Sequence, residues 1–147
     1  MLINNHLLKA EEGESFSYEE TPNTSGAFPE GLPDTLVMHY TAGADVASSV
    51  KTLTKPSTRA SAHVIIGRDG QIVQLAPFNI ITWHAGASQY KGREGLNHYS
   101  IGIEMDNAGL LEKQGDKYVA WFGRKYGEEE VVKAIHRNQS VERYWHE

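Results

Sequence analysis

Two short β-prone runs around an Asp-Gly pair constrain the fold of this chain more than any other sequence feature. The runs cover residues 62–67 and 71–75, and Asp69 and Gly70 lie between them. Asp-Gly favours the tight turn of a β-hairpin, because such turns need backbone angles that glycine and aspartate tolerate. The sequence therefore predicts an antiparallel hairpin near the middle of the chain, and with it a fold built on a β-sheet.

Other segments supply the remaining elements of that fold. Residues 35–41, 100–105 and 118–122 have the composition or alternation of strands. Asp45 is placed to cap a helix in which the apolar residues recur at helical spacing, and residues 128–137 are also compatible with a helix. The expected fold class is α/β, with a mixed central β-sheet flanked by helices.

The length of 147 residues fits one domain. Residues 1–34 are polar, with Glu-rich and Pro/Ser/Gly-containing stretches, and are predicted to form an extended N-terminal lead-in. Residues 35–147 would then form the domain itself.

Composition excludes several classes of function. The chain has no cysteine, which rules out disulfides and cysteine-ligated zinc or iron–sulfur sites. A net charge of −5 argues against a nucleic-acid-binding protein, which usually has a basic stripe. No basic segment followed by an apolar run begins the sequence, so a cytoplasmic location is expected; the alternative is a phage-type lysin released by other means.

Two residues stand out by position. His39 ends a predicted strand just before a glycine turn, where folds of this class place functional groups, although a buried histidine bonded to backbone would fit as well. Glu104 is a carboxylate on the same strand face as Ser100 and Gly102. This small face suggests a cleft, and the alternative is an ordinary solvent-facing glutamate.

Two further histidines have weaker signals. His63 begins the predicted hairpin and is expected to have a structural role, with hydrogen bonds inside the sheet. His84 lies beside Trp83 in a loop rich in glycine and serine, which suits contact with a ligand.

Four segments together are more specific than any single residue. In order and spacing, residues 39–42, 61–74, 83–88 and 97–104 resemble the zinc-dependent N-acetylmuramoyl-L-alanine amidases, and most of all the cytoplasmic amidases that act on anhydromuropeptides. Phage lysins and peptidoglycan-recognition proteins are similar more distantly. The resemblance implies hydrolysis of the amide between N-acetylmuramic or anhydromuramic acid and the L-alanine of a peptidoglycan stem peptide.

The resemblance also implies roles for single residues. His39 would be a ligand of the Zn²⁺ cofactor, and Glu104 would be the catalytic general base. His84, Asn97 and Arg59 would line the substrate groove, with Arg59 placed to meet a carboxylate of the stem peptide.

One departure from the family pattern stands out. The family takes its other two zinc ligands, a histidine and an aspartate, from a segment after a long C-terminal helix, and this sequence has nothing like it. We therefore expect an incomplete domain, with weak zinc binding and slow or absent hydrolysis. His136 and His146 remain as substitute ligands.

This departure leaves two further functions open. The chain would otherwise be a non-catalytic peptidoglycan- or muropeptide-binding module, or a fold fragment without a function of its own. Without the family's long C-terminal helix, an apolar strip of the sheet would be uncovered. We therefore expect self-association, most simply as a dimer.

Overall fold

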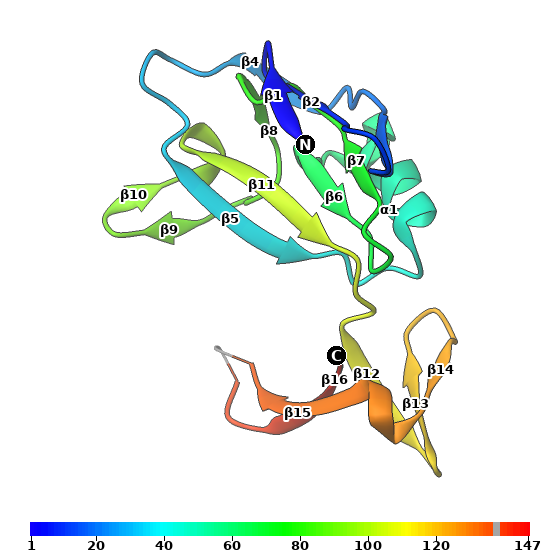
Figure 1. Cartoon of the computed structure of the whole chain (residues 1–147). Coiled ribbons are helices and arrows are strands. Elements are labelled where there is room, and N and C mark those ends of the chain that lie inside the picture. Colours follow the sequence, from blue (N-terminus) through cyan, green and yellow to red (C-terminus); the bar gives the residue numbers. More distant parts are fainter. Residues whose placement is uncertain (137–138) are drawn as a thin grey trace.

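The computed structural model describes residues 1–136 and 139–147, and these residues form two five-stranded sheets and one α-helix (Figure 1). The central sheet has the order β3 (Phe16–Tyr18), β7 (Ile72–Gln74), β6 (Val64–Ile66), β11 (Ser100–Met105) and β5 (Thr35–Tyr40). The second sheet has the order β14 (Lys125–Tyr126), β13 (Lys117–Ala120), β12 (Leu110–Gln114), β16 (Glu142–His146) and β15 (Val131–Ile135).

Short elements complete the described part of the chain. There are three two-stranded sheets in it. They consist of β1 (Leu2–Asn4) with β2 (Leu7–Lys9), β4 (Thr24–Ala27) with β8 (Ile80–Thr82), and β9 (Gln89–Tyr90) with β10 (Arg93–Glu94). The helical elements are α1 (Val46–Leu53) and three 3₁₀ turns, η1 (Pro56–Thr58), η2 (Leu96–His98) and η3 (Glu128–Glu130).

The central sheet is mixed, as the sequence predicts. Strands β6 and β7 form the antiparallel hairpin, while β11 runs parallel to both of its neighbours, β5 and β6. Strand β3 adds a parallel edge beside β7. The strands predicted at residues 35–41 and 100–105 are therefore confirmed, and they lie side by side at one edge of the sheet.

Helix α1 covers one face of this sheet. Asp45 caps it: the carboxylate accepts a hydrogen bond from the backbone N–H of Ser48 at 2.8 Å, which confirms the predicted cap. The apolar stripe of the helix packs on strand residues of the hairpin. The buried core cluster comprises Val46, Val50, Ile65, Val73 and Leu75, with Leu53 against it.

The helix predicted at residues 128–137 is wrong for residues 128–136. Arg137 lies outside the residues that the structure describes. A single 3₁₀ turn, η3, leads instead into strand β15, which pairs antiparallel with β16. Val131, Val132 and Ile135 are β-branched, and a partner strand suits them better than a helix does. The expected flanking helices therefore reduce to α1 in the described residues.

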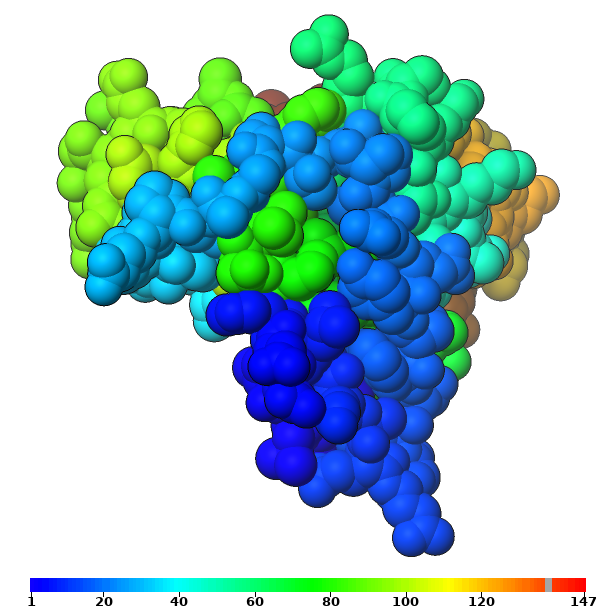
Figure 2. Space-filling model, turned by 90° about the horizontal axis from the view of Figure 1, so that it is seen from above, coloured from blue at the N-terminus to red at the C-terminus, as the bar shows by residue number. Residues whose placement is uncertain are grey.

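Residues 1–34, expected to be irregular, contain four short strands. The backbone carbonyl of His6 accepts a hydrogen bond from the side-chain amide of buried Gln74 at 3.1 Å, and Gln74 accepts one from the N–H of Leu8 at 2.8 Å. Figure 2 shows this N-terminal segment (blue) lying against the middle of the chain (green). The segment thus packs on the sheet, although a domain boundary at residue 34 stays a prediction.

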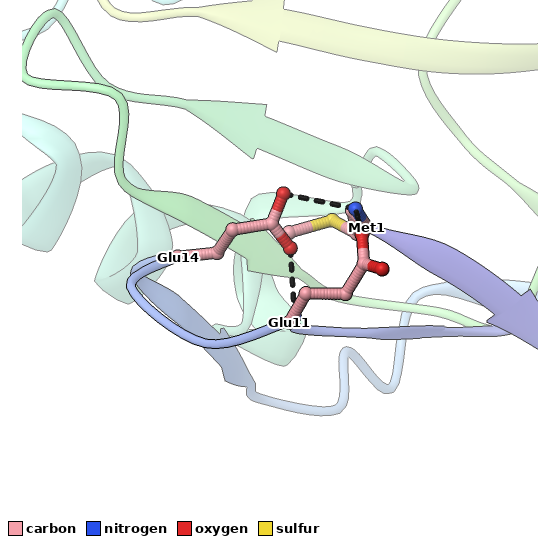
Figure 3. A network of polar contacts seen from close by, with 3 residues as sticks. All are labelled: Met1, Glu11 and Glu14. Atoms are coloured by element: carbon pink, nitrogen blue, oxygen red, sulfur yellow. Dashed lines mark hydrogen bonds and ion pairs between the residues drawn. The ribbon is translucent and has the colours of Figure 1, made fainter.

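The start of the chain is held by charge. The N-terminal ammonium group contacts the carboxylates of Glu11 and Glu14, and Glu14 also accepts a hydrogen bond from the backbone N–H of Glu11 at 2.8 Å (Figure 3). These contacts raise the pKa of the ammonium group, mainly through its hydrogen bond to Glu11. The bonds tie Met1, just before β1, to the turn after β2.

The second sheet is antiparallel throughout and has its own small core. That core comprises Ala108, Leu111, Tyr118, Ala120 and Tyr126, with Phe122, Val131 and Tyr144 against it. The sheet joins the rest of the molecule through polar contacts. The side chain of Asn107 donates to the carbonyl of His146 at 3.1 Å, and the indole N–H of Trp121 donates to the carbonyl of Ala42 at 2.7 Å.

The face of β5 opposite His39 carries exposed apolar side chains. Leu36, Met38 and Tyr40 alternate along this edge strand, and Met105 of β11 is the register partner of Tyr40. Leu36 is 65% exposed. Within the described residues, no helix is long and apolar enough to cross a membrane.

Candidate active site

His39 and Glu104 leave the sheet on the same face. They are register partners in the parallel strands β5 and β11, and paired residues of neighbouring strands project to one side. Ile65, the partner of Glu104 on its other side, packs in the core against α1. Both site residues therefore lie on the face that α1 partly covers, and both are half-buried.

His84 reaches the same face from the loop after β8, and Gly102 makes the space for it. A Cβ atom at position 102 would lie 2.3 Å from Cγ of His84, so no side chain fits there. Gly102 precedes Glu104 by two residues and so shares its face. The Nδ1 atom of His84 lies 3.0 Å from the Nε2 atom of His39.

The hydrogen-bond network assigns the protons on these two rings. The hydroxyl of Ser100 donates to the carbonyl of Leu96 at 2.6 Å, so its oxygen accepts from Nε2 of His84 at 3.1 Å. Neutral His84 then presents an acceptor at Nδ1, and His39 donates to it through Nε2. This leaves the Nδ1 atom of His39 unprotonated, with a lone pair for a ligand.

Burial keeps these rings neutral. Burial first and the neighbouring His39 second lower the pKa of His84 to about 4, and the hydrogen bond to the backbone of Ser100 opposes this shift. Burial also lowers the pKa of His39. Two imidazoles in contact at neutral pH are consequently both uncharged, which is the state in which a histidine binds a metal.

The carboxylate of Glu104 has no hydrogen bond or ion pair to any other residue that the structure describes. Burial raises its pKa, and its Oε2 atom is buried with no hydrogen-bond partner among the described residues. A buried polar atom in this state has a desolvation cost unless a ligand or water satisfies it. Glu104 also lines a cavity of about 320 Å³ between α1 and the second sheet, so such a ligand has room.

The structure places the two other predicted groove residues differently. The side-chain oxygen of Asn97 accepts hydrogen bonds from the backbone N–H groups of His84 and Ala85, at 3.0 and 2.7 Å, so Asn97 positions the loop that bears His84. Arg59 is exposed, in the left-handed conformation that ends η1. In the described part of the chain, no hydrogen bond or ion pair joins Arg59 to His39, His84 or Glu104.

His63 has the structural role that the sequence predicts. It is fully buried, with Nε2 2.8 Å from the carbonyl of Ile80 and Nδ1 3.0 Å from both the backbone nitrogen of Gly102 and the hydroxyl of Thr82. Burial lowers the pKa of His63 to about 4. All of its polar contacts are internal.

The donor set does not complete a zinc site. A catalytic zinc needs three protein ligands, and the described residues contain no group of three or more His, Asp or Glu side chains placed to hold a metal. The ring of His136 stacks on Trp145, and Nδ1 of His146 accepts from the N–H of Ala108 at 3.1 Å. His39 and the unpartnered oxygen of Glu104 fit part of a metal site, and the described residues supply no more.

Sequence reasoning missed Trp121 and Phe122, which line the same cavity as Glu104. They follow β13, in a segment that was predicted only as a strand. Two adjacent aromatics next to the turn glycine Gly123 were the available signal, because aromatics at a turn tip seldom belong to a core.

The sequence and the fold of this chain are similar to those of known proteins. The sequence model of the family described as N-acetylmuramoyl-L-alanine amidase matches residues 29–138. The 1,6-anhydro-N-acetylmuramyl-L-alanine amidase AmpD of Escherichia coli K12 is 52% identical over 60 residues, which are 41% of this chain and 33% of that protein. The N-acetylmuramoyl-L-alanine amidase AmiD of the same strain is 36% identical over 118 residues, 76% of this chain and 41% of that protein.

A solved structure is similar as well. The crystal structure of a selenomethionine AmpD derivative has a TM-score of 0.57 and 32% identity, covering 72% of this chain and 66% of that one. In the sequence comparison, by contrast, the chain spans about a third of the length of the first curated relatives it matches. Because the family match extends over most of the sequence, the chain belongs to the N-acetylmuramoyl-L-alanine amidase family.

Proposed function

We propose that this chain acts as an N-acetylmuramoyl-L-alanine amidase, which hydrolyses the amide between N-acetylmuramic or anhydromuramic acid and L-alanine. The observation that supports this best is the unpartnered buried oxygen of Glu104, beside His39 and at the edge of a cavity. Family membership supplies the reaction class, and the names of AmpD and AmiD supply the bond and the muropeptide substrate.

Glu104 is the proposed general base. Its raised pKa makes the carboxylate a stronger base than an exposed glutamate. It takes a proton from a water molecule as the water oxygen attacks the amide carbonyl carbon. The same carboxyl group then gives that proton to the nitrogen as the C–N bond breaks, so that a carboxylic acid and an amine leave.

The other residues have binding roles in this proposal. The unprotonated Nδ1 of His39 is the proposed zinc ligand, and zinc remains part of the proposal as a family expectation. Because the described residues do not complete its site, no step of the reaction is assigned to the metal. Asn97 acts by holding His84 in place, and Arg59 offers a cation for a carboxylate of the stem peptide.

A Glu104→Gln variant tests the reaction. Glutamine keeps the size of the side chain but cannot accept the proton, so turnover of an anhydromuropeptide should fall by about 10²- to 10⁴-fold. Binding of the intact substrate should persist. Product release followed by chromatography gives the first quantity and calorimetry the second. Measurable turnover that is equal in the variant and the wild type would exclude Glu104 as the base, and no turnover by the wild type would contradict the amidase function itself.

One observation favours a second candidate, a non-catalytic muropeptide-binding module. The described residues supply His39 but no three-ligand group for zinc. A module of this kind would bind the muropeptide with zinc far below one equivalent and with no turnover. Metal analysis, calorimetry and the turnover assay on one preparation separate the two functions.

A further inference from the structure

The cavity beside Glu104 has two chemically different walls. One comes from α1 and contains the hydroxyl groups of Ser49 and Thr52. These hydroxyls donate to helix carbonyls, at 3.0 Å to Asp45 and 2.9 Å to Ser48, so their oxygens remain able to accept hydrogen bonds. The opposite wall is aromatic.

The aromatic wall is exposed and yet fixed. Trp121 is 79% exposed, but its indole N–H donates to the carbonyl of Ala42 at 2.7 Å. Phe122 meets it edge-on, with ring centroids 5.5 Å apart, and the guanidinium of Arg124 lies 5.9 Å from the centroid of Phe122. An indole that faces water beside a cavity, with its N–H already bonded, is suited to a ligand with an apolar face.

The Trp121 bond also spans the two sheets. Its acceptor, Ala42, has a positive φ of 47°, which is uncommon outside glycine, and lies in the turn that follows His39 and β5. Backbone strain of this kind clusters at functional sites. The bond therefore sets the position of the aromatic wall relative to the strand that bears His39.

Charge narrows the class of ligand. Among the residues that line this cavity, Glu104 is the charged one, and none is lysine or arginine. A stem peptide with free carboxylates finds no cation there. A neutral ring with hydroxyl groups on its edge and C–H groups on its face matches the hydroxyl wall and the aromatic wall together.

We propose that this cavity is the saccharide subsite, in which the muramyl ring stacks on Trp121 while its amide lies at Glu104. The inference rests on the proposed function, since that function supplies the sugar. It places the stem peptide on the other side of Glu104, toward His84. Trp121 is then a specificity residue for the sugar half of the substrate.

Calorimetry on the whole chain in a Glu104→Gln background tests the subsite, because the substrate then stays intact. The two probes are N-acetylmuramoyl-L-alanyl-D-isoglutamine and the same dipeptide without the sugar. Trp121→Ala should raise the Kd of the first by roughly tenfold or more and leave that of the second unchanged. Trp121→Phe should restore most of the loss.

The control is Trp145→Phe, which removes an indole of the same sheet outside this cavity, keeps an aromatic ring against Tyr40 and should leave both Kd values unchanged. Circular dichroism and Tm establish that each variant folds. An unchanged Kd for the muropeptide in Trp121→Ala, an equal loss for both probes, or no muropeptide binding by the parent would overturn the subsite. If Trp121→Ala weakens muropeptide binding and the wild type shows no turnover, the subsite is supported and the amidase function is contradicted.

Discussion

Nε2 of His39 and Nδ1 of His84 lie 3.0 Å apart, and this contact decides which nitrogen of His39 stays available. The direction of the bond follows from Ser100, whose hydroxyl is already committed to the carbonyl of Leu96. Besides the groove role that the sequence predicts for it, His84 orients His39 through this contact. A hydrogen bond to the other ring nitrogen commonly fixes the tautomer and orientation of a metal-binding histidine.

The tautomer is directly measurable. We predict that the ¹⁵N chemical shifts of His39 at pH 7 show a protonated Nε2 and an unprotonated Nδ1. In His84→Ala the acceptor is lost, so the ring should populate both tautomers. An Nδ1–H tautomer of His39 in the wild-type protein would show that the assigned network is reversed.

Zinc affinity should depend on His39. We predict that His39→Ala abolishes the zinc binding that the wild-type chain shows, because a site short of ligands cannot lose one. His63→Ala is the matched control: it should lower stability and leave the zinc content of the folded fraction unchanged. Metal analysis of the purified proteins measures both, and equal zinc retention by His39→Ala would exclude it as a ligand.

Gly102→Ala should damage the site without changing any polar group. The new Cβ would collide with the ring of His84 at 2.3 Å from Cγ, so either the ring or the strand must shift. We expect a cost of about 1–3 kcal/mol in the free energy of unfolding and loss of the contact between His39 and His84. Denaturant unfolding and histidine NMR report these. A variant with wild-type stability and shifts would mean that His84 does not pack on Gly102.

Acid should destabilise the fold through its buried histidines. The pKa of His63 is about 4 in the folded protein against an ordinary value of 6.5, so the unfolded chain binds more protons in this range. The stability is complete above pH 6.5 and is lost as the pH falls toward 4. Between pH 7 and pH 5, His63 should account for about 2 kcal/mol of that loss.

Denaturant unfolding at the two pH values checks this against His63→Gln, which keeps a donor for the carbonyl of Ile80. The variant should be less stable than the wild type at pH 7, but its free energy of unfolding should fall less than that of the wild type between pH 7 and pH 5. His84, with a similar pKa, should still contribute its part. A loss in the variant equal to that of wild type would assign the acid sensitivity to other groups.

Self-association stays a prediction, now with a defined surface. Leu36, Met38 and Tyr40 are exposed on the edge strand β5, and a second copy of the chain is the simplest partner for such a face. Light scattering should show a concentration-dependent dimer. Leu36→Glu with Met38→Glu should shift it to monomer, whereas Val141→Glu, an exposed apolar site outside this face, should not. A monomer at all concentrations would contradict the prediction.

Local pattern was enough to predict the half of the molecule that holds the site. The Asp-Gly hairpin, the helix capped by Asp45 and the strand that carries His39 near its end depend on neighbours in sequence, and each formed as expected. The shared face of His39 and Glu104 follows from two strands whose alternation was readable. His84 reaches them by a loop, which only its motif context indicated.

The second sheet could not be read in the same way. Residues 131–135 form a short, mostly apolar run. Such a run is compatible with a helix or with a strand until its pairing partner is known. Their partner, β16, is identified by tertiary pairing rather than by sequence period. The role of Asn97 was hidden for a similar reason, because the backbone groups it binds belong to residues 13 and 12 positions earlier, beyond the reach of a helix or strand period.

The indole bond from Trp121 to Ala42 joins two parts of the molecule that have separate hydrophobic cores. The residues proposed for the chemistry lie in the central sheet, while the aromatic wall is borne by a turn of the other sheet. Substitutions in that turn could diverge among descendants without disturbing His39 or Glu104. The arrangement offers an engineer the same freedom: if the proposed subsite holds, the turn that follows β13 can be changed to accept a different ring while the residues proposed for the chemistry stay as they are.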